Sequence, residues 1–172
     1  MIRVYDNFLE DYKREELYMM SVTTDYKIGW DDSSTIEYRQ YPCFYHEVTK
    51  QEWEDLDFLN NIINIPEELN DLTFTKAVIN LVTPSAVHFP HTHQNQTVLC
   101  YYYNTEWRDE WYGETIFYNA EKSDATGVVM YKPNRAVLFK GEIPHSIRPA
   151  SFIAAQYRFT LSIFFEDSKN NS

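Results

Sequence analysis

Residues 97–119 read TVLCYYYNTEWRDEWYGETIFYN, and this stretch decides the fold. It contains two short runs rich in β-branched and aromatic residues, TVLCYYYN and ETIFYN, which are typical of β-strands. The polar residues from Asn104 to Asp109 separate the two runs and favour a turn. The stretch therefore predicts two short strands joined by an irregular connection.

Runs of the same kind continue on both sides of this stretch. They are LTFTKAVINLV at 72–82, GVVMY at 127–131, RAVLFK at 135–140 and QYRFTLSIFF at 156–165. Turn-forming residues lie between them, among them Pro84, Asn119, Asp124 and Gly141. Many short strands divided by turns are typical of an all-β barrel or sandwich. We therefore expect a mostly β fold, a jelly-roll barrel over about residues 71–166.

The N-terminal part of the chain, over about residues 1–70, is predicted to be largely helical. A short strand at 2–5 precedes a helix that starts at Asp6 or Asn7 and continues through FLEDYKREELYMMSV. A second helix is predicted from Thr49 to Ile63, because Thr49 and Glu52 have the spacing of a capping box. Since no repeat or linker divides the chain, we expect a single domain over 1–172, with the helices packed outside one sheet.

Charge and composition restrict the function. The net charge of -11 disfavours nucleic-acid binding, which needs a basic surface, and only four glycines occur, in no phosphate-binding pattern. No apolar run is long enough to span a membrane, and the N-terminus has charges where a signal peptide needs apolar residues. Cys43 and Cys100 are expected to be reduced, buried thiols. We therefore expect a cytoplasmic protein without nucleic-acid or membrane partners.

Histidines cluster in a pattern that indicates a metal site. His91 and His93 lie two residues apart in HFPHTH, and side chains two apart in an extended segment point to the same side. His145, in IPHSIRP near a later strand, would complete a set of three ligands with open positions for oxygen chemistry at iron. The alternative is a solvated turn. His88 is a rival ligand that would alternate to the opposite face, and His46 is expected to be structural.

Arg158 is a second chemical signal. It lies in a strand that is otherwise apolar or small, and a buried guanidinium needs an anionic partner. One interpretation is an internal ion pair with Asp or Glu. The other is a carboxylate ligand, which suits the planar fork of arginine. A dicarboxylate that chelates the metal at one end could reach Arg158 at the other.

Together these motifs resemble the Fe(II) and 2-oxoglutarate-dependent oxygenases of the prolyl 4-hydroxylase-like family, which have a double-stranded β-helix fold. The resemblance covers about residues 76–165 and rests on an ordered set of segments. These are HTH, CYYYN, TEWRDEWYGETIF, RAVLFK, IPHSIRP and YRFTLSIFF. The N-terminal VYDNFLEDYKREEL is similar to the opening strand and helix of the family.

The resemblance implies a dioxygenase that decarboxylates 2-oxoglutarate to succinate and hydroxylates a peptidyl, prolyl-like or small-molecule substrate. Fe(II) would be held by His91, His93 and His145, with O2 as cosubstrate and ascorbate as a candidate reductant. Arg158, Tyr102 and Ser162 would bind the distal carboxylate of 2-oxoglutarate. Loops 31–48 and 104–113 would flank the substrate, and the first of them contains Tyr38, Tyr41, Phe44 and Tyr45. Trp107, Gly113, Glu114 and Thr115 are expected to be structural. The oligomeric state stays open.

The chain departs from the family at one position, where His93 stands in place of the usual aspartate of the HxD motif. A shifted register, with His93 as first ligand and Asn95 in the acid position, is the weaker alternative. Halogenating relatives have a small residue at the acid position, and histidine is not small, so we do not expect halogenation. Two other functions stay open. One is a cupin-type, three-histidine dioxygenase that uses no 2-oxoglutarate, and the other is a non-catalytic β-barrel binding protein.

Overall fold

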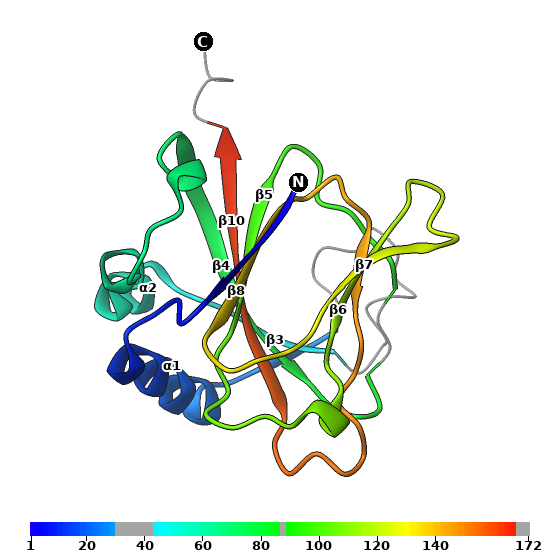
Figure 1. Cartoon of the computed structure of the whole chain (residues 1–172). Helices are drawn as coiled ribbons and strands as arrows, with labels where there is room; N and C mark the ends of the chain where they lie inside the picture. The colour runs from blue at the N-terminus through cyan, green and yellow to red at the C-terminus, as the bar shows by residue number, and fades with distance from the viewer. Residues whose placement is uncertain (30–42, 87–88, 168–172) are drawn as a thin grey trace.

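The computed structural model describes residues 1–29, 43–86 and 89–167, and these residues form two β-sheets (Figure 1). The larger sheet has the strand order β1-β8-β5-β10-β4-β3-β2, and the smaller one has the order β7-β6-β9. The strands are β1 (Ile2–Asp6), β2 (Lys27–Ile28), β3 (Phe44–Glu47), β4 (Leu72–Val82), β5 (Thr97–Tyr102), β6 (Thr115–Tyr118), β7 (Ala125–Val129), β8 (Arg135–Lys140), β9 (His145–Ile147) and β10 (Arg158–Asp167). All the pairings are antiparallel, and the expected mostly β, double-stranded β-helix fold is confirmed.

Strand β10 lies in the middle of the larger sheet and separates two hydrophobic clusters. It pairs with β4 on one side and with β5 on the other. Alternate side chains of a strand point to opposite faces, so Phe159, Leu161, Ile163 and Phe165 pack into one cluster while Phe164 packs into the other. Arg158 lies on the same face as Phe164 by this alternation. The second cluster, which includes residues of β5, β6 and β8, is the interior of the barrel.

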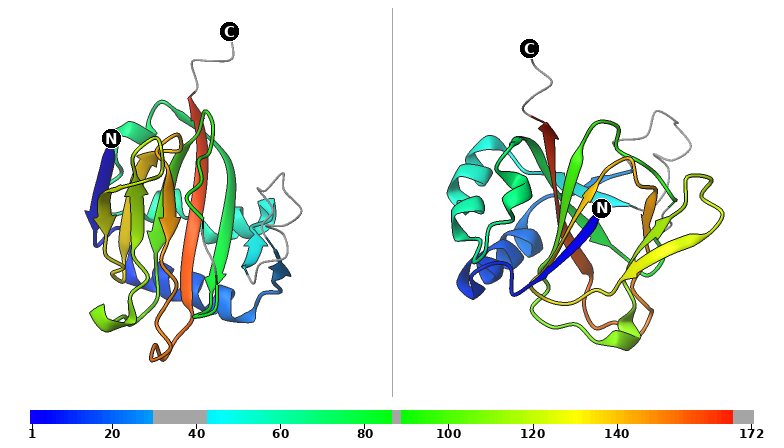
Figure 2. Two further views of the ribbon diagram at one scale, coloured as in Figure 1. Left: turned by 90° about the vertical axis from the view of Figure 1, so that its right-hand side faces the viewer. Right: turned by 45° about the horizontal axis from the view of Figure 1, so that its top comes forward.

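Two helices cover the outer face of the larger sheet, on the side opposite β6 and β7 (Figures 1 and 2). They are α1 (Asp11–Thr23) and α2 (Lys50–Leu56), and single 3-10 turns follow at Leu59–Asn61, Glu67–Leu69 and Asp109–Trp111. Leu17 of α1 and Leu56 of α2 are buried in the first cluster, which lies between the helices and the larger sheet. Of the helices in the described ranges, none has both the length and the apolar character that crossing a bilayer requires.

The boundaries of the helices differ from the expected ones for local reasons. Helix α1 begins at Asp11, not at residue 6 or 7, because Asn7 has φ 51° and Leu9 forms a bridge with Ile62. Helix α2 has the predicted capping box of Thr49 and Glu52. It ends at Leu56, well before residue 63, because Asp57 adopts the left-handed conformation. The first seventy residues also contribute β1, β2 and β3 to the larger sheet.

Asn134 connects the N-terminal segment to the barrel. Its side chain accepts hydrogen bonds from the Leu9 amide (2.9 Å) and the Tyr101 hydroxyl (2.8 Å), and it donates one to the Leu9 carbonyl (2.8 Å). Asn134 is buried and has φ 61°, a conformation that asparagine tolerates better than most residues. One amide therefore satisfies three polar groups that the packing of residues 8–9 would otherwise leave buried.

The Asn134→Ala variant is expected to unfold about 3 kcal/mol more easily than the wild type, because it leaves those groups without partners. Urea denaturation followed by circular dichroism measures the free energy of unfolding. Asn60→Ala is the control, since Asn60 is exposed and its bond to Asp57 lies at the surface; it should change stability by less than about 0.5 kcal/mol. Equal effects of the two variants would contradict this role of Asn134.

Candidate metal centre

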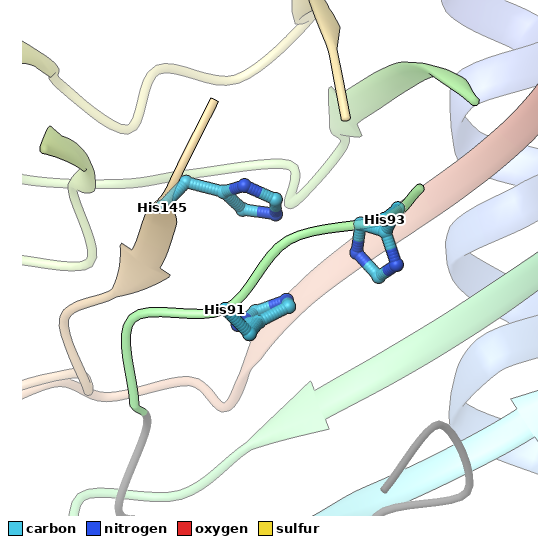
Figure 3. A group of neighbouring side chains, drawn as sticks. All are labelled: His91, His93 and His145. Atoms are coloured by element: carbon cyan, nitrogen blue, oxygen red, sulfur yellow. The ribbon is translucent and has the colours of Figure 1, made fainter. Parts of the chain in front are cut away.

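Three imidazoles from two separate segments meet inside the barrel (Figure 3). One nitrogen from each of His91, His93 and His145 lies within 4.8 Å of the others. The ring centroids are 4.4 Å apart for His91 and His145, 5.0 Å for His91 and His93, and 5.3 Å for His93 and His145. Figure 3 shows His145 projecting from β9 towards the segment that holds the other two. Separations of this size allow one ion to contact all three rings.

The backbone brings the two segments together. The amide of His91 donates to the carbonyl of His145, and the amide of His145 donates to the carbonyl of His91, both at 3.0 Å. This isolated antiparallel bridge extends the smaller sheet beyond β9, which itself pairs with β6. His91 and His145 are therefore directly opposite each other, and the local ladder sets their spacing.

Two of the three rings are oriented by the same kind of hydrogen bond. Nδ1 of His91 lies 2.9 Å from the Phe89 carbonyl, and Nδ1 of His145 lies 2.8 Å from the Ile143 carbonyl. A carbonyl only accepts, so Nδ1 carries the proton in both rings and Nε2 keeps its lone pair. Metal-binding histidines are commonly held in this way, with the second nitrogen donating to a carbonyl or carboxylate. Both rings are thus prepared to donate through Nε2.

His145 is the most buried of the three, and its pKa is lowered from 6.5 to about 3. Burial is the main cause, and the neighbouring His91 and His93 add to it, while the bond to Ile143 opposes it. The ring is consequently neutral at physiological pH. A neutral imidazole is the form that binds a metal ion.

The metal-free protein is expected to lose stability in acid because of His145. A histidine whose folded pKa is depressed stabilises the protein above its unfolded pKa of about 6.5, and that contribution falls as the pH falls towards 3. Urea denaturation in the presence of a chelator, from pH 7 to pH 4, should show a slope up to roughly 1 kcal/mol per pH unit steeper than that of His145→Asn. Asparagine keeps a donor for Ile143 but does not titrate. Parallel profiles would contradict the assignment.

The three histidines open into a cavity of about 100 Å³, room for a small molecule. Its walls are the inner face of the larger sheet and the strands β6 and β9. The residues that line it include Phe44, Tyr45, Glu47, Lys76, Val78, Asn80, Val98, Cys100, Thr115, Phe139, Ile147, Ser162 and Phe164. The ring centroids are 4.9 Å apart for Phe164 and His93 and 4.6 Å apart for Phe139 and His145. One aromatic ring thus packs against each of these two imidazoles.

Arg158 is fully buried in the barrel, and the residues that the structure describes give it no countercharge. Its Nε donates to the Gly113 carbonyl at 2.8 Å, and its guanidinium carbon lies 5.4 Å from the ring centre of Tyr102 and 4.9 Å from that of Tyr131. Nη1 and Nη2 have no hydrogen-bond partner among the described residues. The expected alternative of an internal ion pair is therefore not seen in the described part of the chain. The two Nη groups and the positive charge could therefore bind an external anion.

The residues predicted to assist Arg158 lie in successive rows across the inner face. Ser162 pairs with Cys100 and lines the cavity, and its hydroxyl accepts from Asn80 at 3.2 Å. Tyr102 pairs with Thr160, one row closer to Arg158, and its hydroxyl is 2.6 Å from the Thr115 hydroxyl. Thr115 itself lines the cavity and pairs with Ile147 of β9. Tyr102 therefore lies between the cavity wall and the guanidinium.

Two residues near Arg158 were not anticipated. Thr160 is fully buried, and its hydroxyl has no partner among the described residues. It lies two positions after Arg158, so strand alternation alone places it on the same face, and that rule could have found it. Tyr131 stacks on Tyr102 with ring centroids 4.6 Å apart, and together the two rings pack against the guanidinium. No local pattern in the sequence marks Tyr131 for this role.

Other candidate residues lie elsewhere. His46 is bound to Glu52 at 3.0 Å and to Thr24 at 3.1 Å, outside the cavity, so it is structural as expected. Asn95 is exposed in the turn after His93 and does not line the cavity. His88, Tyr38 and Tyr41 lie outside the described residues. Phe44 and Tyr45 line the cavity, whereas no residue of 104–113 does.

The side chains fit the metal and cosubstrate that the sequence implied. Three neutral nitrogen donors suit a divalent first-row metal such as ferrous iron. A buried guanidinium and a hydroxyl, both with unused hydrogen-bonding capacity, suit the far carboxylate of a diacid. Cys100, Thr115 and Ser162 line the cavity together with the three histidines, whereas Arg158 and Thr160 lie behind its wall.

Comparisons with known proteins place the fold. No protein-family model matches the sequence, and neither does any curated protein. Among solved structures, a prolyl-4-hydroxylase from Pseudomonas putida matches with a TM-score of 0.65 at 16% identity, over 96% of this chain and 92% of that one. HygX from Streptomyces hygroscopicus, with nickel and 2-oxoglutarate bound, matches with a TM-score of 0.66 at 8% identity, over 98% of this chain and 83% of that one.

A third solved structure is a prolyl hydroxylase from Trichoplax adhaerens in complex with a hypoxia inducible factor peptide fragment. It matches with a TM-score of 0.62 at 15% identity, over 98% of this chain and 84% of that one. All three matches extend over nearly the whole of this chain. The chain therefore has the double-stranded β-helix fold of prolyl hydroxylases and other 2-oxoglutarate-dependent non-haem iron oxygenases, with a three-histidine cluster inside it.

Proposed function

We propose that this chain is a non-haem Fe(II) and 2-oxoglutarate-dependent dioxygenase that hydroxylates a peptidyl or small-molecule substrate. The observation that carries the proposal is the presence, inside one barrel, of three converging imidazoles and a buried guanidinium that finds no countercharge in residues 1–29, 43–86 and 89–167. A buried, unpaired cation is costly to a protein that does not use it. A dicarboxylate held between metal and arginine removes that cost.

Each residue has a role in this proposal. Nε2 of His91 and of His145, with one nitrogen of His93, would hold the ion, and the two Nδ1 bonds keep the first two rings in the metal-binding tautomer. Fe(II) with 2-oxoglutarate would supply oxygen activation coupled to decarboxylation of the cosubstrate to succinate. Arg158, with the hydroxyls of Tyr102 and Ser162, would bind the distal carboxylate, and we add Thr160 to this set because its hydroxyl is buried beside Arg158 with no partner among the described residues. Phe139 and Phe164, which pack against the rings of His145 and His93, would limit the access of water to the ion.

The substrate would enter on the side of β3. Phe44, Tyr45 and Glu47 of that strand line the cavity together with Lys76 and Asn80 of β4. A substrate bound there would contact these side chains. A peptide is one candidate, since the Trichoplax adhaerens neighbour is in complex with a peptide fragment. A cytoplasmic location, supported by two cysteines that form no disulfide, is part of the same proposal.

Anaerobic titration of the purified protein with Fe(II) and then 2-oxoglutarate tests the proposal. Chelation of ferrous iron by the 2-oxo acid should produce a visible charge-transfer absorption that neither component gives alone. Admission of O2 should then release succinate. A protein that binds neither ion nor acid would be the non-catalytic barrel, and the proposed function would be refuted.

A second candidate is a three-histidine dioxygenase that uses no 2-oxoglutarate. The ligand set favours it, because all three donors are neutral imidazoles and no carboxylate belongs to the cluster of described residues. In that case Fe(II) would bind, but adding 2-oxoglutarate would leave the visible spectrum unchanged. The same titration therefore separates the two enzymes.

A further inference from the structure

We propose that Gly141 is the positioning residue for His93, and that the absence of a side chain at residue 141 sets where the third imidazole lies. The inference rests on the proposed function, since it concerns the geometry of the proposed metal ligand. Gly141 follows β8 directly and is buried. It belongs neither to the cavity wall nor to the three histidines.

The chain around His93 wraps closely about Gly141. The amide of His93 donates to the Gly141 carbonyl at 2.8 Å, and the amide of Gly141 donates to the Gln96 carbonyl at 2.7 Å. Asn95, at φ 57°, turns the segment back, and its amide donates to Oε1 of Glu142 at 2.9 Å. Residues 93–96 and 141–142 thus interlock through three hydrogen bonds. His93 lies outside any regular strand, so this turn determines its backbone position.

A side chain at residue 141 has no space. A Cβ there would collide with the His93 carbonyl oxygen and would lie 2.8 Å from His93 Cβ and 2.9 Å from the Gln96 carbonyl oxygen. These atoms belong to the backbone or its first side-chain carbon, so no rotamer change relieves the contact. The backbone conformation itself does not demand glycine, because Gly141 lies outside the left-handed region that Gly29 and Gly113 occupy. Space, not strain, is the constraint.

Any methyl group at 141 must therefore push the backbone of His93 outwards. The His93 ring lies edge-on to Phe164, and its centroid is 5.3 Å from that of His145. A shift of the His93 backbone therefore moves the ring away from the position where the three imidazoles converge. His91 and His145 stay bridged to each other and keep their Nδ1 bonds. The expected result is a site with two good ligands and one displaced ligand.

Titration with Co(II) alone, followed by calorimetry and by its d–d absorption bands, tests the proposal. Gly141→Ala should bind Co(II) about 10- to 100-fold more weakly than the wild type, the size usual for loss of a residue that orients a ligand. Gly127→Ala is the matched control, because a Cβ at Gly127 meets no atom within 4 Å. It should bind within about twofold of the wild type.

A double-mutant cycle of Gly141→Ala with His93→Ala distinguishes an effect on the position of His93 from a general loss of stability. If Gly141 acts through His93, adding Gly141→Ala to His93→Ala should cost no further Co(II) affinity, although the stability loss remains. Equal losses in the two backgrounds, or wild-type affinity in Gly141→Ala, would overturn the proposal. A wild type that binds no Co(II) would instead refute the proposed function.

Glu142→Ala covers the case in which Gly141→Ala does not fold. Glu142 is exposed, so the variant should fold, but the turn loses the acceptor for Asn95. We expect Co(II) affinity to fall about fivefold, equivalent to one hydrogen bond, and only when His93 is present. No change, or a loss independent of His93, would count against a positioning role for this turn.

Discussion

Arg158→Met should weaken 2-oxoglutarate binding at least about 100-fold while leaving metal affinity unchanged. Removing one partner of a buried, hydrogen-bonded charge pair typically costs about 3–5 kcal/mol, which corresponds to a 100-fold or larger change in affinity. Arg158 has two unused Nη donors, and methionine fills similar space without charge. Calorimetric titration of 2-oxoglutarate into the Fe(II)- or Co(II)-loaded variant measures the loss.

In the absence of cosubstrate, we expect Arg158→Met to have no unfavourable effect on the free energy of unfolding. A guanidinium whose charge is buried and unpaired destabilises the fold, so its replacement should leave the free energy of unfolding unchanged or raise it. If Arg158 were instead paired with an internal acid, the same replacement would lower the free energy of unfolding of the protein by about 3–5 kcal/mol. Urea denaturation without metal or 2-oxoglutarate distinguishes the two.

Arg108→Met is the control for both measurements. Arg108 is more than half exposed, pairs with Glu106 at the surface and contacts Trp111 outside the cavity. It should alter neither 2-oxoglutarate affinity nor stability by more than about 0.5 kcal/mol. If Arg158→Met bound 2-oxoglutarate like the wild type, the three-histidine enzyme without this cosubstrate would replace the proposed one.

Much of the fold could be predicted because strand composition is a local signal. The runs LTFTKAVINLV and RAVLFK coincide with β4 and β8 over their full length. The errors lie where tertiary contacts override local preference. Helix α1 starts late because Phe8 and Leu9 are buried beside Asn134, and β9 exists as a strand through its pairing with β6 and His91. Neither contact can be read from residues nearby in the sequence.

For the candidate site, too, local features could be predicted from the sequence and tertiary contacts could not. The spacing of His91 and His93 and the presence of a lone arginine in an apolar strand are local facts, so these residues could be named from sequence. Whether Arg158 has an internal partner depends on packing across the barrel, and the structure shows Tyr102 and Tyr131 there instead of an acid. The role of Gly141 depends on the course of residues 93–96, which the sequence shows only as a polar turn.

His93→Ala should reduce the affinity for Fe(II) or Co(II) at least about 100-fold, because two imidazoles then remain of three. His93→Asp should recover part of that loss. A carboxylate supplies a negative charge and an oxygen donor at the position where the family pattern has one, and ferrous iron accepts a set of two histidines and one carboxylate. Metal titrations of the three proteins under anaerobic conditions, in the same buffer, give the comparison.

Asn95→Ala tests which residues form the set. Asn95 is exposed in the turn after His93 and does not line the cavity, and the three imidazoles already supply three donors, so the variant should bind metal within a few-fold of the wild type. If Asn95→Ala abolished binding and His91→Ala did not, the ligands would be His93, Asn95 and His145, in the shifted register. If His93→Asp bound no better than His93→Ala, the backbone at 93 would be too far from the ion for a carboxylate. The turn around Gly141 would then be adapted to the longer reach of imidazole, and histidine at this position would be a requirement of the geometry.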